Sequence, residues 1–239
     1  MRDDGDGDRA IVVIPTLDEA ENIGPLAAEL LALPDRLDLL VVDDSSRDGT
    51  AERVRAIARE TQRVHLLERP RRLGLGTAYR DGFRWALERG YGRLVQMDAD
   101  HSHRPEDVPR LLEALTRADI AVGSRYLPAS RITGWPRRRW LLSRCAALYV
   151  APILGLGVSD PMGGFKAYRA AALSRMGLDA FQATGYLFQA ESLFRASRAG
   201  CSLEEVAIHF RDRAAGVSKM TGGIILEAAL GPFRIRFGR

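Results

Sequence analysis

Two aspartates separated by one residue, Asp98 and Asp100, follow a short apolar run that ends at Val95. Carboxylates at this spacing, in a loop after a strand, can share a hard divalent cation directly or through water. A Mg²⁺ or Mn²⁺ ion held by so few carboxylates usually completes its shell with water and the phosphate oxygens of a substrate. The pair alone is equally compatible with a turn that caps the helix expected after Pro105. The other motifs of the chain must therefore decide between the two interpretations.

Short apolar runs alternate with helical patterns along the chain. Runs rich in β-branched and aliphatic residues predict buried strands at 10–14, 37–42, 64–67, 93–95 and 120–122, with a further strand at about 203–209. Helical patterns follow the strands, and Thr16 is expected to cap the first helix. The glycine-containing segment 160–169 is expected to be a loop that returns to the sheet. The alternation predicts an α/β fold with an open, mostly parallel sheet flanked by helices.

In such sheets, ligands bind beyond the carboxyl ends of the strands. Three segments should therefore meet at one edge: 15–19, the pair Asp43 and Asp44, and 98–102. Carboxylates after the second strand suit the hydroxyl and N–H donors of a ribose or a base. A dinucleotide-binding fold is disfavoured, because the turn at 15–19 contains no glycine and the segment 74–76 lacks the third glycine of the fingerprint.

The bulk composition fits one compact domain with a C-terminal elaboration. The chain has 239 residues, of which 46% are hydrophobic, and a net charge of +4, which favours anionic partners such as nucleotides or acidic lipid surfaces. Its two cysteines form no C-x-x-C pattern, which fits a reducing compartment and no zinc site. Residues 1–9 are polar and acidic and are expected to be disordered. No segment reaches the ~20 apolar residues that span a bilayer.

Past residue 123, arginines alternate with tryptophans and leucines. The segment 131–158 therefore suggests a basic amphipathic helix at a membrane interface, although a solvated basic face on an ordinary helix is the alternative. Further along, Arg213 and Lys219 stand on a glycine-bearing loop that could close over a diphosphate. His101 and His103 flank the acidic pair and could contact a phosphate. Gln189 and Glu191 could face the site, but each is more typical of a helix surface.

Together these segments resemble glycosyltransferase family 2, and within it the dolichol- or polyprenol-phosphate mannose synthases. The similarity runs from about residue 10 to 222, and the matching motifs lie at 13–16 with Glu19, 41–50, 73–79, 97–105, 123–126, 160–166 and 218–220. The order and spacing of these motifs are specific, although each motif alone is weak. One departure is Leu17-Asp18, where the family often has Tyr-Asn, so stacking of residue 17 on a base is not expected.

The resemblance implies a GT-A domain at 10–222, followed by a tail at 223–239. It also implies inverting transfer of mannose from GDP-mannose to a polyprenyl phosphate, with Mg²⁺ or Mn²⁺ as cofactor. By residue-for-residue match, the nucleotide sugar would be held by Pro15, Leu17, Glu19, Val42, Asp44, Asp98, Ala99, Arg213 and Lys219. The metal would lie near Asp98, Asp100 and Ser102, and the acceptor phosphate near Arg125, Arg139 and Ser143. Asp100 and Arg125 are the residues expected to be catalytic.

The residue inventory suits this chemistry. An acceptor phosphate is already anionic near neutral pH, so an in-line attack needs positioning and charge compensation more than a strong base. Glu191 is therefore not expected to act as a base. The chain resembles the subtype without transmembrane helices, which implies peripheral attachment to the cytosolic face of a membrane through 131–158 and the tail, or through a membrane-protein partner.

Two alternatives stay open at this point. Within the family, the donor could be UDP-glucose or another nucleotide sugar, because the sequence does not reveal which sugar epimer the pocket accepts. Outside it, the chain could be a non-catalytic module that binds nucleotides or nucleic acid through its basic surface. No nucleic-acid-binding motif is present, so a nucleic-acid partner is not expected.

Overall fold

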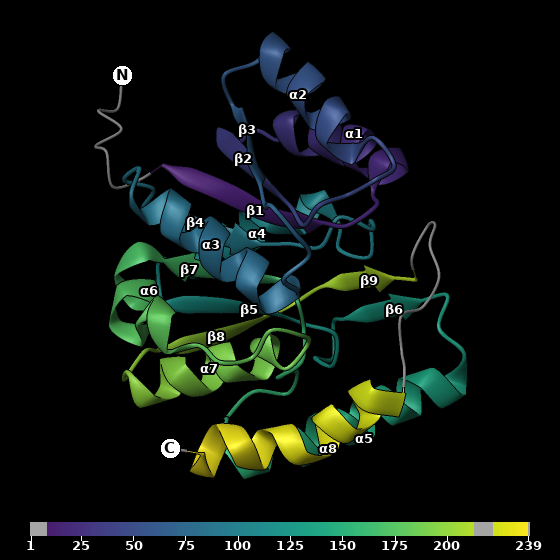
Figure 1. Cartoon of the computed structure of the whole chain (residues 1–239). Helices are drawn as coiled ribbons and strands as arrows, with labels where there is room; N and C mark the ends of the chain where they lie inside the picture. The colour runs from purple at the N-terminus through teal and green to yellow at the C-terminus, as the bar shows by residue number, and fades with distance from the viewer. Residues whose placement is uncertain (1–8, 213–221, 239) are drawn as a thin grey trace.

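The computed structural model describes residues 9–212 and 222–238 of the chain (Figure 1). Its centre is a seven-stranded sheet with the order β3-β2-β1-β4-β7-β5-β8. Only β7 runs antiparallel to its neighbours β4 and β5, whereas the other pairs are parallel. The strands are β1 (Ala10–Thr16), β2 (Leu37–Asp43), β3 (Val64–Glu68), β4 (Arg93–Gln96), β5 (Ile120–Ser124), β7 (Lys166–Arg169) and β8 (Leu203–Ala207). The predicted α/β fold with a mostly parallel sheet is confirmed.

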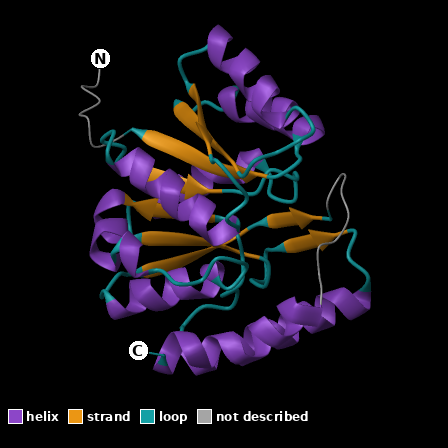
Figure 2. Cartoon of the chain, viewed as in Figure 1, coloured by secondary structure: helices purple, strands orange, loops and turns teal. Residues whose placement is uncertain are grey.

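Helices cover both faces of this sheet, as the layers in Figure 2 show. In β1, alternate side chains enter two separate apolar clusters: Ile11 and Val13 belong to one, and Val12 and Ile14 to the other. The helices α1 (Ala20–Leu31), α2 (Thr50–Glu60) and α4 (Val108–Ala114) contribute to the cluster of Val12. The helices α3 (Leu75–Leu87), α6 (Ala170–Met176) and α7 (Phe188–Arg198) contribute to the cluster of Ile11. Burial on both faces explains why the parallel strands are continuous apolar runs.

Two longer helices lie outside these layers. The helices α5 (Arg137–Leu154) and α8 (Gly222–Phe237) run side by side along the bottom of Figure 1. A short parallel pair, β6 (Arg131–Thr133) with β9 (His209–Arg211), leads toward them. Within the described parts of the chain, no helix has the length and apolar character needed to cross a membrane.

Two local expectations are wrong. Thr16 does not cap α1, because it is the last residue of β1 and its hydroxyl donates to Asp43 Oδ1 at 2.9 Å. The N–H groups of Glu19 and Ala20 are instead bound by Thr50 Oγ1 and Asp48 Oδ2, each at 2.9 Å. The cap of the first helix thus comes from the start of the second, a pairing that depends on the folded sheet and that no local pattern reveals.

The segment 160–169 also differs from the expected loop. Its last four residues form β7, which inserts between β4 and β5. The strand is short and begins with Lys166, a fully buried side chain, so it lacks the apolar run that identified the other strands. The Lys166 ammonium donates to Gly163 O and to Gln189 Oε1 at 2.7 Å, and these partners allow it to lie inside the protein.

Candidate active site

A cavity of about 460 Å³ opens beyond the carboxyl ends of β1, β2 and β4. Seven of the residues predicted for the site line it, from three different strand ends: Pro15, Leu17, Glu19, Asp44, Asp98, Ala99 and Asp100. The rest of the wall comes from Thr16, from Arg72 and the start of α3, and from residues 184–186 before α7. The strand-end rule therefore locates this cavity correctly.

The two aspartates of the acidic pair are held by different groups. Asp98 accepts a hydrogen bond from the Tyr79 hydroxyl at 2.9 Å, and its N–H donates to His103 Nδ1 at 3.4 Å. Burial lowers the pKa of His103, which therefore stays neutral at pH 7 and serves as an acceptor. Asp100 Oδ1 accepts the N–H of Ser102 at 3.1 Å, across a turn in which His101 has a φ of 55°. Both carboxylates are thus fixed at the edge of the cavity.

This donor set suits a hard cation. Both carboxylates offer oxygen ligands, and Gly164 keeps the space beside Asp98 open, since a Cβ there would lie 3.0 Å from Asp98 Oδ2. Among the side chains described at residues 9–212 and 230–238, no three His, Cys, Asp or Glu come together as a metal cluster. A cation held here would depend on water and substrate oxygens for the remainder of its shell, which is typical of Mg²⁺-type sites.

Two glycines shape the wall opposite the aspartates. A Cβ at Gly76 would lie 2.3 Å from the carbonyl oxygen of Ala183, and one at Gly74 would lie 2.7 Å from that of Thr184. The Gly76 N–H also donates to Thr184 O at 2.8 Å. The glycines therefore allow residues 183–186 to approach the start of α3, which brings Tyr186 to the cavity.

Asp44 has a structural task at the cavity wall. Its two oxygens accept the N–H groups of Leu73 and Gly74 at 2.9 and 2.8 Å, and Arg69 lies 3.0 Å from Oδ1. These contacts fix the loop before α3. Val42, which was also expected to hold the nucleotide, is fully buried in the core and does not line the cavity. Arg72, which sequence reasoning missed, lines the cavity and has no partner among the described residues.

Arg125 is held by a buried ion pair with Asp160. Its Nε and Nη2 donate to the two carboxylate oxygens at 2.7 and 2.8 Å, and its N–H donates at 3.0 Å. Burial alone would lower the pKa of Arg125, but the negative charge of Asp160 raises it above its ordinary value. The guanidinium also lies over the rings of Tyr126 and Trp135, at 5.4 and 5.5 Å. Arg125 is therefore a fixed positive charge beside the cavity.

The other two residues expected at the acceptor phosphate lie around the same aromatic rings. Arg139 contacts the Trp135 ring at 4.5 Å and pairs with Asp212 at 2.7 Å. The Tyr126 hydroxyl donates to Ser143 Oγ at 2.6 Å. The structure thus brings Arg125, Arg139 and Ser143 into one cluster. The Trp135 Nε1–H is buried and has no hydrogen-bond partner in the described part of the chain.

Several predicted residues lie elsewhere. Ser102 is buried beneath the acidic pair and does not line the cavity, and Arg213 and Lys219 lie outside the described residues. Glu191 accepts the N–H groups of Gln182 and Ala183, at 3.0 and 2.7 Å, and pairs with Arg195. These hydrogen bonds fix the start of the 182–186 loop. Sequence reasoning also missed the contact of Tyr79 with Asp98, because no spacing rule links the middle of a helix to a strand end.

Comparison with known proteins agrees with this geometry. The family model described as glycosyl transferase family 2 matches residues 11–177, well over half of the chain. The chain belongs to glycosyl transferase family 2. This family 2 protein is 45% identical over 222 residues to an undecaprenyl-phosphate mannosyltransferase of Micrococcus luteus, covering 93% of this chain and 91% of the relative. It is 44% identical to a polyprenol monophosphomannose synthase of Mycolicibacterium smegmatis, covering 92% of this chain and 84% of the relative.

Solved structures establish the fold of the family 2 chain. It superposes on glucosyl-3-phosphoglycerate synthase from Mycobacterium tuberculosis, solved with Mn²⁺, UDP and glucosyl-3-phosphoglycerate, with a TM-score of 0.71. The match covers 95% of this chain and 80% of that chain at 20% identity, so it is a likeness of fold alone. The expected GT-A fold is confirmed.

Proposed function

We propose that this family 2 protein transfers mannose from GDP-mannose to a polyprenyl phosphate, with inversion at the anomeric carbon. The observation that carries the proposal is the identity of 45% and 44%, over more than nine-tenths of the chain, to two relatives named for mannose and polyprenyl phosphate chemistry. The matched length of 222 residues is long enough to include both Asp98 to Asp100 and the Arg125 cluster.

Asp98 and Asp100 would hold Mg²⁺ or Mn²⁺ at the edge of the cavity. The oxygen-only donor set supports a hard divalent cation, and the structural neighbour was solved with Mn²⁺. When bound, such an ion neutralises charge on the diphosphate leaving group. Tyr79 and the Ser102 N–H keep the two carboxylates in place before the ion arrives, so little reorganisation accompanies binding.

The acceptor phosphate would bind in the cluster around Trp135. Arg125 and Arg139 supply two guanidinium groups, which both lie against the Trp135 ring. A phosphate oxygen held there would attack the sugar carbon while the nucleoside diphosphate leaves from the other side. Because the phosphate is already charged, these residues need only orient it and balance its charge. The two carboxylates described in this cluster, Asp160 and Asp212, are paired with Arg125 and Arg139.

The α5–α8 pair would attach the protein to the cytosolic face of a membrane. The helices expose Leu141, Leu142, Leu148, Tyr149, Phe233 and Phe237, and arginines lie in the first turn of α5 and in the last turn of α8. Large apolar side chains beside basic ones are typical of helices that lie at the bilayer surface. Such an attachment would bring the Trp135 cluster, which includes Arg139 and Ser143 of α5, to the phosphate of a lipid whose chain stays in the membrane.

The deciding experiment measures transfer of labelled sugar from GDP-mannose to a short polyprenyl phosphate, with and without Mg²⁺ or Mn²⁺. UDP-glucose serves as the competing donor, and Asp35→Ala, an exposed loop aspartate, serves as the control for Asp100→Ala. Metal-dependent lipid-linked mannose, reduced at least about 100-fold in Asp100→Ala but not in the control, supports the proposal. Transfer of glucose without transfer of mannose would contradict GDP-mannose as the donor.

A lack of transfer from either donor would point to a non-catalytic module. In that case the thermal stability of the protein would separate the remaining alternatives, since a ligand that binds the folded state raises the melting temperature. Stabilisation by GDP with Mn²⁺ would indicate nucleotide binding, whereas stabilisation by an oligonucleotide would indicate nucleic-acid binding.

A further inference from the structure

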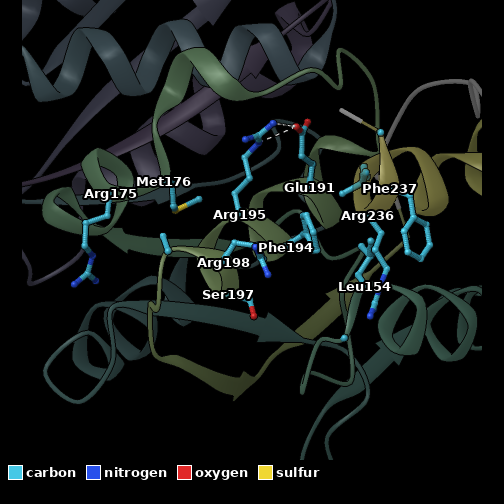
Figure 3. Close-up of a pocket in the computed structure, with 14 residues that line it drawn as sticks. Leu154, Arg175, Met176, Glu191, Phe194, Arg195, Ser197, Arg198, Arg236 and Phe237 are labelled. Atoms are coloured by element: carbon cyan, nitrogen blue, oxygen red, sulfur yellow. Dashed lines mark hydrogen bonds and ion pairs between the residues drawn. The ribbon is translucent and has the colours of Figure 1, made fainter.

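A second cavity, of about 740 Å³, lies where α6 and α7 meet the ends of α5 and α8 (Figure 3). It shares no lining residue with the strand-end cavity. Four arginines line it, against one acidic side chain, Glu191. The cavity is therefore electropositive, and an anion is the ligand that its charge favours.

Two of the four arginines already have carboxylate partners. Arg195 lies 2.8 Å from Glu191, and Arg175 lies 2.7 Å from Asp119. In Figure 3 the Arg195–Glu191 pair lies in the upper middle of the view, and Arg175 extends away from the other labelled residues. The positive charges of these two side chains are neutralised by carboxylates, so the positive charge of the cavity comes from the other two arginines.

Arg198 and Arg236 have no carboxylate partner in the described part of the chain. Arg198 is the exposed last residue of α7, and no group among residues 9–212 and 230–238 binds it. Arg236, on α8, donates to the carbonyl oxygen of Ile153 and lies 5.6 Å from the Phe237 ring. Figure 3 shows both side chains away from the Arg195–Glu191 pair. Two helices thus present uncompensated guanidinium groups to one cavity, and guanidinium groups bind phosphate strongly.

The rim of the cavity is apolar. Phe194, Ile235 and Phe237 line it, and the Phe237 side chain is 68% exposed. Phe237 stacks on Phe233, which in turn contacts Tyr149 on α5, so the exposed apolar surface continues along the α5–α8 pair. A free phosphate ion would make no use of this surface. An amphiphile with an anionic head and hydrocarbon chains would use both the arginines and the aromatic rings.

We propose that this cavity binds the headgroup of an anionic glycerophospholipid. Arg198 and Arg236 hold the phosphate, and the acyl chains extend over Phe237 toward the exposed face of α5 and α8. The site recognises bulk lipid of the membrane surface and is separate from the strand-end cavity and from the Trp135 cluster. It would fix the orientation of the α5–α8 pair on the membrane, beyond the general attraction between basic residues and an acidic bilayer.

The first test compares binding of the full chain to phosphatidylcholine vesicles with and without phosphatidylglycerol. The variants are Arg198→Gln and Arg236→Gln, and Arg234→Gln is the matched control, because Arg234 is exposed on the same helix but does not line the cavity. Loss of one interfacial charge weakens binding by about fivefold. We expect each cavity variant to lose at least about tenfold, because a charge-assisted hydrogen bond is lost as well. Equal losses in all three variants would overturn the proposal.

The second test uses soluble ligands and the melting temperature of the protein. Short-chain phosphatidylglycerol should stabilise the wild type and fail to stabilise Arg198→Gln, whose unliganded melting temperature should match that of the wild type because the side chain has no partner to lose. Equal stabilisation by inorganic phosphate would show a free-anion site, and equal stabilisation by short-chain phosphatidylcholine would show apolar contact alone. Either result overturns the proposal. Neither test involves mannose transfer, so both are independent of the proposed function.

Discussion

At the strand ends, the cavity is lined by Glu19, Asp44, Asp98 and Asp100, whereas the cavity beside α7 and α8 is lined by four arginines and one glutamate. The two cavities also differ in how their charged side chains are bound by neighbouring groups. Asp44 binds two backbone N–H groups and Arg69, and Asp98 binds the buried Tyr79 hydroxyl. In the helix cavity, Arg198 and Arg236 are exposed and lack carboxylate partners in the described chain. The first arrangement is fixed before any ligand arrives, and the second is free to adapt to one.

Fixed carboxylates favour a ligand that must be positioned for a reaction, because preorganised charges lose little free energy when the ligand binds. Three cations near the strand-end cavity follow the same rule, since Arg69, Arg125 and Lys166 are each partnered and largely buried, whereas Arg72 on the cavity wall is exposed. Exposed arginines suit a lipid surface, where many headgroup positions are acceptable. The contrast therefore separates a reacting site from an attachment site, and each prediction below tests how firmly the reacting site is held.

The largest effect is expected for Gly76→Ala. The new Cβ would lie 2.3 Å from Ala183 O and 2.9 Å from Phe188 Cβ, so backbone must move. We expect a loss of about 3 kcal/mol in the free energy of unfolding, measured by urea denaturation, because forced overpacking costs this much in well-packed sites. The KM for the nucleotide sugar should rise as well, because residues 184–186 line the cavity.

Gly24→Ala is the matched control for this substitution. Gly24 lies inside α1, and a Cβ there would meet no atom within 4 Å. Alanine should therefore change the free energy of unfolding by less than about 1 kcal/mol, because its better helix propensity is opposed by contact of the new Cβ with Pro25, the next residue. If both variants behaved alike, the close approach of residues 183–186 to α3 would not be a constraint on the cavity.

A pH dependence is expected from Lys166. Burial lowers its pKa from 10.5 to about 7, so between these values the unfolded chain carries a proton that the folded protein lacks. The free energy of unfolding therefore rises with pH across this window, by about 2 kcal/mol from pH 7 to pH 9. Lys166→Met should lack this rise, as measured by urea denaturation at both pH values. Parallel profiles for the two proteins would mean that the ammonium is not desolvated as the structure indicates.

The two cavities also differ in how far the sequence reveals them. The strand-end cavity follows from short apolar runs and one topological rule, so Pro15, Glu19, Asp98 and Asp100 were all predicted to lie at one edge. The helix cavity joins Arg198 and Arg236 across separate helices, and no local pattern encodes that contact. The sequence also does not reveal β7 or the capping of α1 by Asp48, because both depend on contacts between residues that are far apart in the chain. Sequence periodicity reports which face of an element is buried, and it does not report which element covers that face.

Glu191 connects the two regions. Its carboxylate lines the helix cavity, and it accepts the N–H groups of Gln182 and Ala183, which lead to the strand-end cavity. Glu191→Gln keeps the shape of the side chain but removes the charge that binds Arg195. We expect a loss of about 2 kcal/mol in the free energy of unfolding, which is typical of hydrogen bonds to a charged group. The exposed Glu60→Gln is the control, and an equal effect there would show that Glu191 does not support the loop.

The smallest effect is expected for Tyr79→Phe, which removes one hydroxyl from the acidic pair. The Tyr79 ring stays packed against Phe83 and Phe188, at 5.9 and 5.7 Å, so the fold should persist. The substitution removes the 2.9 Å hydrogen bond from Tyr79 to Asp98. We expect the affinity for the divalent cation to fall about tenfold, as for other residues that orient a metal ligand. Titration of mannose transfer with Mn²⁺ measures this change.

Tyr91→Phe separates this positioning effect from a general loss of stability. The Tyr91 hydroxyl also donates to an aspartate, Asp38, at 2.6 Å, but neither residue lines the strand-end cavity. Both variants should lose about 1 kcal/mol in the free energy of unfolding, since each leaves one carboxylate with fewer donors. Only Tyr79→Phe should shift the Mn²⁺ concentration at half-maximal transfer. If the Mn²⁺ concentration at half-maximal transfer shifted equally in Tyr91→Phe, the acidic pair would be responding to overall stability. The strand-end carboxylates would then be no more firmly held than the arginines of the helix cavity.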